Sequence, residues 1–353
     1  MYKITVIIPT YNEESTLLTC FDSLLNQTIG FENIEIIIVD DNSTDTTQKM
    51  INDLTRKYKN VNSFFLKNTS EDPGVPRNIG IQNSSTDYVM FLDSDDIFYP
   101  EMCEVMHSTI KSNSVDICVC RYKELVESEI REFHSHFIDN FVNKTKIDSF
   151  NDPDLFMAYP FVWNKIFRKN FILEKNILFP HASNEDFHFS LETFLKSEGI
   201  YLLNNFYGYQ YTAPTSKNKH MSNTLDQKKF KNLLKGFILI LKLADKTDTP
   251  NLIDVKNFIL TVLIIRLLSH DLDEKCMTQA LSESKSYFKS YNIFARFKYT
   301  NIWLNYSVNI FIKLSSFSNS IPKVLYKLFH KIIQKKFDYI NKKLLPGVYN
   351  KNN

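Results

Sequence analysis

Apolar runs alternate with amphipathic segments over the first hundred residues of this 353-residue chain. That alternation predicts an α/β fold with a mostly parallel, Rossmann-like sheet flanked by helices. Polar residues follow the runs, and ligands of such sheets bind beyond the carboxyl ends of the strands. The length also exceeds that of one ordinary domain. We therefore expect an α/β domain at residues 1–227 and a mainly helical, basic domain at residues 228–353.

Each element of the first domain has its own signal. Continuous β-rich apolar runs are typical of strands buried on both faces, and they fall at Ile4–Ile8, Ile34–Val39, Val61–Leu66 and Tyr88–Leu92. Apolar residues at helical spacing or capping residues predict helices at Ser15–Gln27, from Ser43 to Tyr58, at Arg77–Asn83 and at Asn184–Lys196. A further helix and strand are predicted between Glu101 and Tyr122.

Composition limits the class of protein. The chain is 43% apolar and 23% charged, which is typical of a soluble globular protein. Its net charge of +2 gives no indication of nucleic-acid binding. Five cysteines without a framework spacing indicate reduced thiols. No apolar run reaches the roughly 18–20 residues that a membrane span needs, so we expect a cytoplasmic protein, either free or at the inner face of the cell membrane.

The predicted fourth strand is followed by Asp93-Ser94-Asp95-Asp96. Three carboxylates this close repel one another unless a cation lies among them. Hard oxygen ligands suit Mn²⁺ or Mg²⁺ carried on a phosphate. For Asp96, capping of the following turn is an equal alternative to metal binding. Upstream, Gly74 and Gly80 flank Arg77, and we expect them to let the backbone bend past a ligand to which the arginine supplies positive charge.

Five motifs, taken together, carry a family resemblance. "VIIPTYNEE", "VDDNSTDTT", "GVPRNIG", "FLDSDD" and "NEDFHF" resemble, in order and spacing, the inverting family 2 glycosyltransferases of the GT-A fold, over roughly the first 225 residues. Within that family, the proline before Arg77 and the late "HMS" are most similar to the poly(ribitol phosphate) teichoic-acid N-acetylglucosaminyltransferases.

The resemblance implies roles for particular residues. Those implied in nucleotide binding are Pro9, Thr10, Tyr11, Asp41, Asn68, Arg77, Asp93 and His220. Asp95 would bind the metal that bridges the diphosphate, and Asp186 would be the catalytic base. Glu185 is an alternative base. Because adjacent helical residues diverge by about 100°, only one of the two acids can face the cleft well.

The implied activity is metal-dependent transfer of a sugar, N-acetylglucosamine from its UDP form, to wall teichoic acid. A departing diphosphate needs a metal and nearby cations, and the attacking hydroxyl needs a carboxylate to take its proton. Capsular, exopolysaccharide and lipid-linked glycans remain open as products.

Two other classes compete with this interpretation. Phosphatases of the haloacid-dehalogenase type also place two aspartates after a strand, but near the N-terminus and with Thr or Gly usually following the second, whereas Ile97 follows Asp96 here. A non-catalytic nucleotide- or carbohydrate-binding protein would have lost the base or the metal aspartates, and both are present.

The C-terminal stretch from Ile321 to Leu344 has an apolar stripe with lysines on its opposite face. It is interpreted either as a helix packed on its own domain or on another subunit, or as a basic helix at an anionic surface, which would be a membrane or an acidic polymer. The similar enzymes imply a homo-oligomer, such as a trimer, that associates through this end.

Overall fold

The computed structural model describes residues 1–126, 128–133, 145–147, 154–213, 227–245, 255–256 and 259. The chain divides into two compact units. The first comprises Met1–Phe133 with Asp139–Ala213, and the second comprises His134–Ile138 with Pro214–Asn353. The described residues of the candidate site belong to the first unit.

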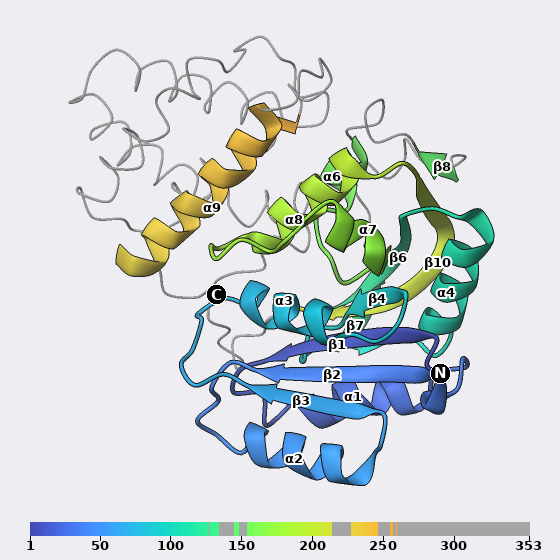
Figure 1. Ribbon diagram of the computed structural model, residues 1–353, viewed down its shortest axis with the longest axis vertical. Coiled ribbons are helices and arrows are strands. Elements are labelled where there is room, and N and C mark those ends of the chain that lie inside the picture. The colour runs from blue at the N-terminus through green and yellow to red at the C-terminus, as the bar shows by residue number, and fades with distance from the viewer. Residues whose placement is uncertain are drawn as a thin grey trace. The chain divides into compact units, whose positions relative to one another are not determined.

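A mixed sheet forms the first unit (Figure 1). Its strands are β1 (Ile4–Thr10), β2 (Ile34–Asp40), β3 (Val61–Phe65), β4 (Tyr88–Phe91), β5 (Ile97–Phe98), β6 (Ile117–Val126), β7 (Glu129–Glu132), β8 (Lys146–Ile147), β9 (Lys165–Arg168) and β10 (Ile200–Thr212). Their order is β3-β2-β1-β4-β9-β6-β10-β5, with β7 beside β6 and β8 beside β10. Every residue of β1 and β2 is buried, as expected of central strands.

Helices connect and cover these strands. In the first unit they are α1 (Leu17–Leu25), the short 3₁₀ helix η1 (Phe31–Asn33), α2 (Thr47–Lys57), α3 (Gly74–Asn83), α4 (Met102–Asn113), α6 (Asp154–Ala158), α7 (Lys169–Glu174) and α8 (Glu185–Lys196). In the second unit α9 spans Gln227–Asp245.

The predicted alternation of the first four strands with three helices is confirmed, with ends shifted by a few residues. The sheet, however, is mixed rather than mostly parallel. Parallel pairs join β1 to β2, β2 to β3, β1 to β4 and β6 to β10, whereas β9 runs antiparallel between β4 and β6. The strand β9 has four residues and is followed directly by α7. A run this short has no periodicity from which a strand, or its direction in the sheet, could be predicted.

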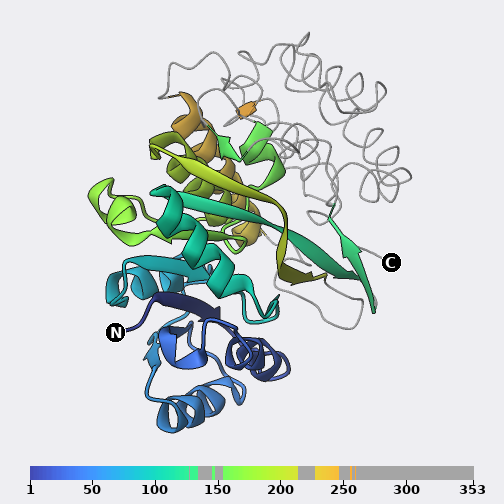
Figure 2. The same cartoon turned by 90° about the vertical axis from the view of Figure 1, so that its right-hand side faces the viewer.

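The strands β6 and β10 run side by side (Figure 2). Their register shifts between Leu203 and Tyr207 and again between Tyr207 and Tyr209, so the last part of β10 is offset from the first. That last part also pairs antiparallel with β5, which begins directly after the aspartate turn. The end of β10 therefore lies beside Asp93–Asp96.

In the described part of the chain the cysteines are buried, unpaired thiols, as the sequence predicted: Cys20, Cys103, Cys118 and Cys120. Burial raises the pKa of the Cys103 thiol and of the Cys118 thiol, which keeps both in the neutral form. Cys276 lies outside the described residues.

Beyond residue 226 the structure describes one helix with given bounds, α9. None of the helices the structure describes is long and apolar enough to cross a membrane. The apolar stripe from Ile321 to Leu344 lies outside the described residues, and the helical character of the C-terminal domain and its boundary near residue 227 remain predictions.

Helix α3 packs closely on β1. A Cβ atom at Gly80 would lie 2.3 Å from Cγ2 of Ile7, which is fully buried in β1. This contact is too short for any real methyl group. Gly80 therefore sets the distance between the helix and the sheet, and with it the position of Arg77 one turn earlier.

We expect Gly80→Ala to lower the free energy of unfolding by about 1–3 kcal/mol, because overpacking outweighs the better helix propensity of alanine. Urea unfolding measures this change. Gln82→Ala, at an exposed position of the same helix, is the control and should leave the midpoint nearly unchanged. A Gly80→Ala protein as stable as that control would contradict the packing argument.

Candidate functional site

Asp40 organises the loop that begins where β2 ends. Its side chain is fully buried. Oδ2 accepts hydrogen bonds from the Ser43 backbone at 2.9 Å and from Gln48 Nε2 at 2.8 Å, and Thr10 at the end of β1 donates to Oδ1 at 3.4 Å. The carboxyl ends of β1 and β2 are thereby joined. Of the residues predicted there, Pro9 and Thr10 are buried and Tyr11 is half-buried.

Asp41 fixes the loop that follows β3. Its carboxylate accepts hydrogen bonds from the Ser70 backbone at 2.7 Å, from the Thr69 hydroxyl at 2.9 Å and from the Glu71 backbone at 3.2 Å. Asn68 precedes these residues and is exposed. The structure therefore brings Asp41 and the Asn68 loop together, and a uracil contact of either residue remains a prediction.

Arg77 is the central charge of the site. Its side chain is 4% exposed and bridges two acids: Nη2 lies 2.7 Å from Asp93 Oδ1, and Nη1 lies 2.8 Å from Glu185 Oε1. The guanidinium also lies over the ring of Phe179. Burial alone would lower the pKa of Arg77, but the charges of Asp93 and Glu185 outweigh it and hold the pKa above its usual value. One cation thus joins the end of β4 to the start of α8.

The glycines near Arg77 allow close packing, and the approach of a ligand past them remains a prediction. A Cβ at Gly74 would lie 2.9 Å from Glu185 Cγ and from Phe179 Cβ. Gly74 therefore allows the first turn of α3 to approach α8 closely enough for the Arg77–Glu185 pair to form.

The structure separates the roles of Glu185 and Asp186. Glu185 is buried against Arg77, whereas Asp186 is half-buried, and its Oδ1 accepts a hydrogen bond from the Phe187 backbone at 2.8 Å. Burial raises the pKa of Asp186, and the charge of Arg77 opposes that rise. A carboxylate whose pKa is shifted toward neutrality is a better proton acceptor at neutral pH. Of the two, Asp186 has the more exposed side chain, and its role as the base remains a prediction.

The aspartate turn presents its side chains in two directions. Asp93 and Asp95 are half-buried, whereas Ser94 and Asp96 are buried. Asp96 accepts hydrogen bonds from the Tyr209 hydroxyl and from the Thr212 backbone, both at 2.6 Å. Both side-chain oxygens of Asp96 are thus bonded to β10, which is neither of the two roles expected from the sequence.

The acids at this turn fit a cation carried by a substrate. Within the part of the chain that the structure describes, no group of three or more His, Cys, Asp or Glu side chains could hold a metal ion. Mg²⁺ and similar ions commonly bind through one or two carboxylates plus substrate phosphates. Asp93 and Asp95 match that donor set.

Glu13 was not singled out from the sequence, although it lies three positions after the last residue of β1, in "YNEE". It is half-buried, and burial, together with the charges of Asp95 and Asp93, raises its pKa to about 7. Its position after a strand was the available signal. Glu13 adds a further titratable group to the acidic end of the sheet.

Two further contacts had no signal in the sequence. His181 Nδ1 pairs with the buried Asp72, which also accepts from the Gly74 backbone at 3.0 Å and so ties the loop before α8 to the start of α3. Lys165 is fully buried, and its ammonium donates to the carbonyls of Tyr159 and Phe161. Burial lowers the pKa of Lys165 to about 7. These contacts fix the segments that flank α8.

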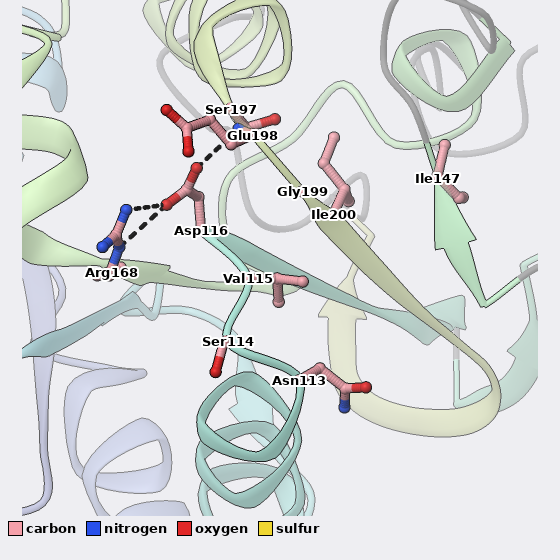
Figure 3. A pocket seen from close by; sticks show the side chains of 10 residues that line it. All are labelled: Asn113, Ser114, Val115, Asp116, Ile147, Arg168, Ser197, Glu198, Gly199 and Ile200. Atoms are coloured by element: carbon pink, nitrogen blue, oxygen red, sulfur yellow. Dashed lines mark hydrogen bonds and ion pairs between the residues drawn. The ribbon is translucent and has the colours of Figure 1, made fainter.

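A cavity of about 660 Å³ lies elsewhere on this unit (Figure 3). Residues from the starts of β6 and β10 and from the end of β9 line it, so it lies at the edge of the sheet opposite the aspartates. Its buried Asp116 is already paired with Arg168 and with the Glu198 backbone. The cavity is therefore separate from the candidate site around Arg77 and Asp93.

His220, predicted to approach the diphosphate, lies outside the described residues. Trp163 is 4% exposed and stacks on Tyr209 with ring centroids 4.3 Å apart. It therefore belongs to the core.

Removal of the positive charge of Arg77 should destabilise the protein. We expect Arg77→Met to lower the free energy of unfolding by about 3–5 kcal/mol, because it leaves Glu185 buried without its partner. The control is Arg168→Met, whose arginine side chain is 47% exposed and should cost less.

This loss should also depend on pH. Burial already raises the pKa of Glu185, and without Arg77 that pKa rises further. The protonated acid is tolerated, so the deficit of Arg77→Met relative to the parent should grow between about pH 7 and about pH 9.5, as the pH passes the Glu185 pKa of about 8. Chemical unfolding at both pH values measures it, and a constant deficit would count against the buried-charge explanation.

The chain is similar in sequence to known glycosyltransferases. Over 225 residues the chain is 31% identical to the poly(ribitol-phosphate) beta-N-acetylglucosaminyltransferase TarP of Staphylococcus aureus, covering 63% of this chain and 66% of TarP. It is 30% identical over 246 residues to a poly(ribitol-phosphate) beta-glucosyltransferase of Bacillus spizizenii, covering 69% of this chain and 37% of that protein. The match thus spans less than two thirds of either relative.

Solved structures share the fold. The crystal structure of S. aureus TarS 1–349 in complex with UDP-GlcNAc superposes with a TM-score of 0.70 at 20% identity, covering 95% of this chain and 92% of that one. A mannosyltransferase from Pyrobaculum calidifontis, in complex with GDP-Man and Mn²⁺, gives a TM-score of 0.53 at 12% identity, covering 94% and 87%. The family model described as glycosyl transferase family 2 matches residues 5–185, just over half of the chain. The chain belongs to glycosyl transferase family 2.

Proposed function

We propose that this chain transfers N-acetylglucosamine, with inversion, from UDP-N-acetylglucosamine to poly(ribitol phosphate) of wall teichoic acid. The observation that carries the proposal is the arrangement around Arg77. That residue aligns the cation-binding turn at Asp93 and Asp95 with the helix that presents Asp186. The sugar and the acceptor are inferred from the names of TarP and TarS and from the UDP-GlcNAc bound to TarS.

The donor would lie across the carboxyl ends of β1 to β4. The nucleotide contacts that we assign are Pro9, Thr10, Tyr11, Asp41, Asn68, Arg77, Asp93 and His220. Asp95, with help from Asp93, would hold Mn²⁺ or Mg²⁺, which would supply positive charge to the departing diphosphate. Arg77 acts on the same phosphates through its charge while its hydrogen bonds go to Asp93 and Glu185.

The transfer needs one base. Asp186 accepts the proton of the acceptor hydroxyl as its oxygen forms a bond with the anomeric carbon. The bond from that carbon to the diphosphate oxygen breaks, and its electron pair leaves on UDP. Attack from the face opposite the leaving group inverts the anomeric configuration. Glu185, paired with Arg77, keeps α8 in place and takes no part in this proton transfer.

The acceptor is a polyanion, which suits the basic residues 228–353. We assign to this segment the acceptor contact and the association into a homo-oligomer, such as a trimer. The described part of it is α9, which carries several lysines, including Lys231, Lys235 and Lys242.

The base assignment predicts that Asp186→Asn lowers kcat roughly 10²–10⁴-fold, because an amide cannot accept the proton. Binding of UDP, measured by calorimetry, should stay within a few-fold of the parent. Asp53→Asn, on the exposed surface of α2, is the control. Turnover that survived in Asp186→Asn would exclude this residue as the base.

The pH profile provides a second test of the same residue. Because burial raises the pKa of Asp186, the acidic limb of kcat/KM should lie above the range of an ordinary aspartate, and activity should rise with pH through it. An acidic limb at the usual aspartate value would contradict the assignment.

The substrate assignment is tested by donor hydrolysis and transfer over a panel of UDP-sugars with Mn²⁺ or Mg²⁺. The same assay with purified wall polymers tests the acceptor. We expect UDP-N-acetylglucosamine and poly(ribitol phosphate) to give the highest kcat/KM. A preference for UDP-glucose would change the sugar, and transfer only to a capsular or lipid-linked glycan would change the acceptor.

A further inference from the structure

The side chain of Asp96 is buried, whereas those of Asp93 and Asp95 are half-buried. It is 1% exposed, and both of its oxygens accept hydrogen bonds from β10. The Tyr209 hydroxyl donates to Oδ2, and the Thr212 backbone donates to Oδ1. The last acid of the turn is thus attached to a strand more than one hundred residues later in the chain.

The Tyr209 hydroxyl also reaches the first acid of the turn. It accepts a hydrogen bond from the Asp93 backbone at 3.4 Å while it donates to Asp96 at 2.6 Å. The turn is closed by a hydrogen bond of 3.0 Å from the Asp96 backbone to the Asp93 carbonyl. One hydroxyl therefore contacts both ends of the turn, with Asp95 between them.

Tyr209 is itself held rigidly. Its side chain is fully buried. Its ring stacks on Trp163 with centroids 4.3 Å apart and meets the edge of Phe98 at 5.7 Å. Its backbone pairs with β5 on one side and with β6 on the other. The hydroxyl is therefore a fixed reference point against which the turn is placed.

We propose that Tyr209 and Asp96 are positioning residues that hold Asp93 and Asp95 in the geometry required to bind the cation that accompanies the donor diphosphate. This inference rests on the proposed function. Neither residue touches substrate. Residues that hydrogen-bond to the ligands of a metal commonly change the affinity of the site for that metal 10–100-fold. Groups that bind a ligand must also be held within about 0.5 Å of their working positions.

The chain offers a matched pair of variants for the test. Tyr209→Phe keeps the stacked ring and removes both hydrogen bonds to the turn. Tyr211→Phe lies on the same strand and also stacks on Trp163, but its hydroxyl makes no hydrogen bond with the described part of the chain. The two variants remove the same atom from neighbouring aromatic positions.

The measurement is calorimetric titration with UDP, in Mn²⁺ and again in EDTA. For Tyr209→Phe we expect the Kd of UDP in Mn²⁺ to rise about tenfold, with less than about a twofold change in EDTA. Tyr211→Phe should match the parent under both conditions. A Tyr209→Phe protein that loses affinity equally in Mn²⁺ and EDTA, or no more than Tyr211→Phe, would overturn the inference.

A second variant addresses the pairing of the two residues. Asp96→Asn removes one of the two acceptor oxygens and should also weaken UDP binding only in Mn²⁺. If the residues act together, Tyr209→Phe combined with Asp96→Asn should be little worse than the more affected single variant. Additive losses would refute the pairing. If both single variants unfold under conditions in which Tyr211→Phe is folded, the pair determines the fold and the inference is refuted.

The parent protein separates this inference from the proposed function. If UDP binds the parent no more tightly in Mn²⁺ than in EDTA, the metal-dependent function fails, and the inference fails with it. If the parent shows the metal effect and Tyr209→Phe retains it in full, the proposed function stands and the positioning role alone is excluded.

Discussion

The guanidinium of Arg77 is the interaction on which the geometry of the site depends. It lies between Asp93 at the end of β4 and Glu185 at the start of α8, with contacts of 2.7 Å and 2.8 Å. A buried charge without a partner is strongly destabilising, so the buried Arg77 and Glu185 each require the other. Because the pair with Glu185 joins residues 108 positions apart, it also fixes α8 relative to the first four strands.

The acids of the site occur as neighbours with opposite roles. Asp95 and Asp186 are half-buried at the cleft, and each adjoins a buried acid, Asp96 and Glu185 respectively. In each case the buried member is tied to a distant element, Tyr209 in one and Arg77 in the other. An acid that is anchored beneath the surface thus orients an acid at the surface through the single peptide bond between them.

The sequence was sufficient for the first four strands, because the Ile- and Val-rich runs of β1 and β2 are long and bounded by turn residues. It also indicated the strand ends, since polar residues stand out directly after such runs. It could not reveal β9, which is four residues long, or the contacts of Tyr209 and Lys165. These contacts depend on which strands become neighbours, and no local pattern at Tyr209 records that its hydroxyl meets an acid 113 residues away.

The close packing at Gly80 has a consequence for how this protein tolerates change. No ligand is assigned to Gly80, yet a Cβ there would overlap Ile7, and α3 would shift with Arg77 on it. A displaced Arg77 would draw apart the two acids that it joins. In a library of variants selected for turnover, position 80 should therefore be as restricted as the acids themselves, so tolerance to substitution alone would not distinguish residues that contact the donor from those that support them.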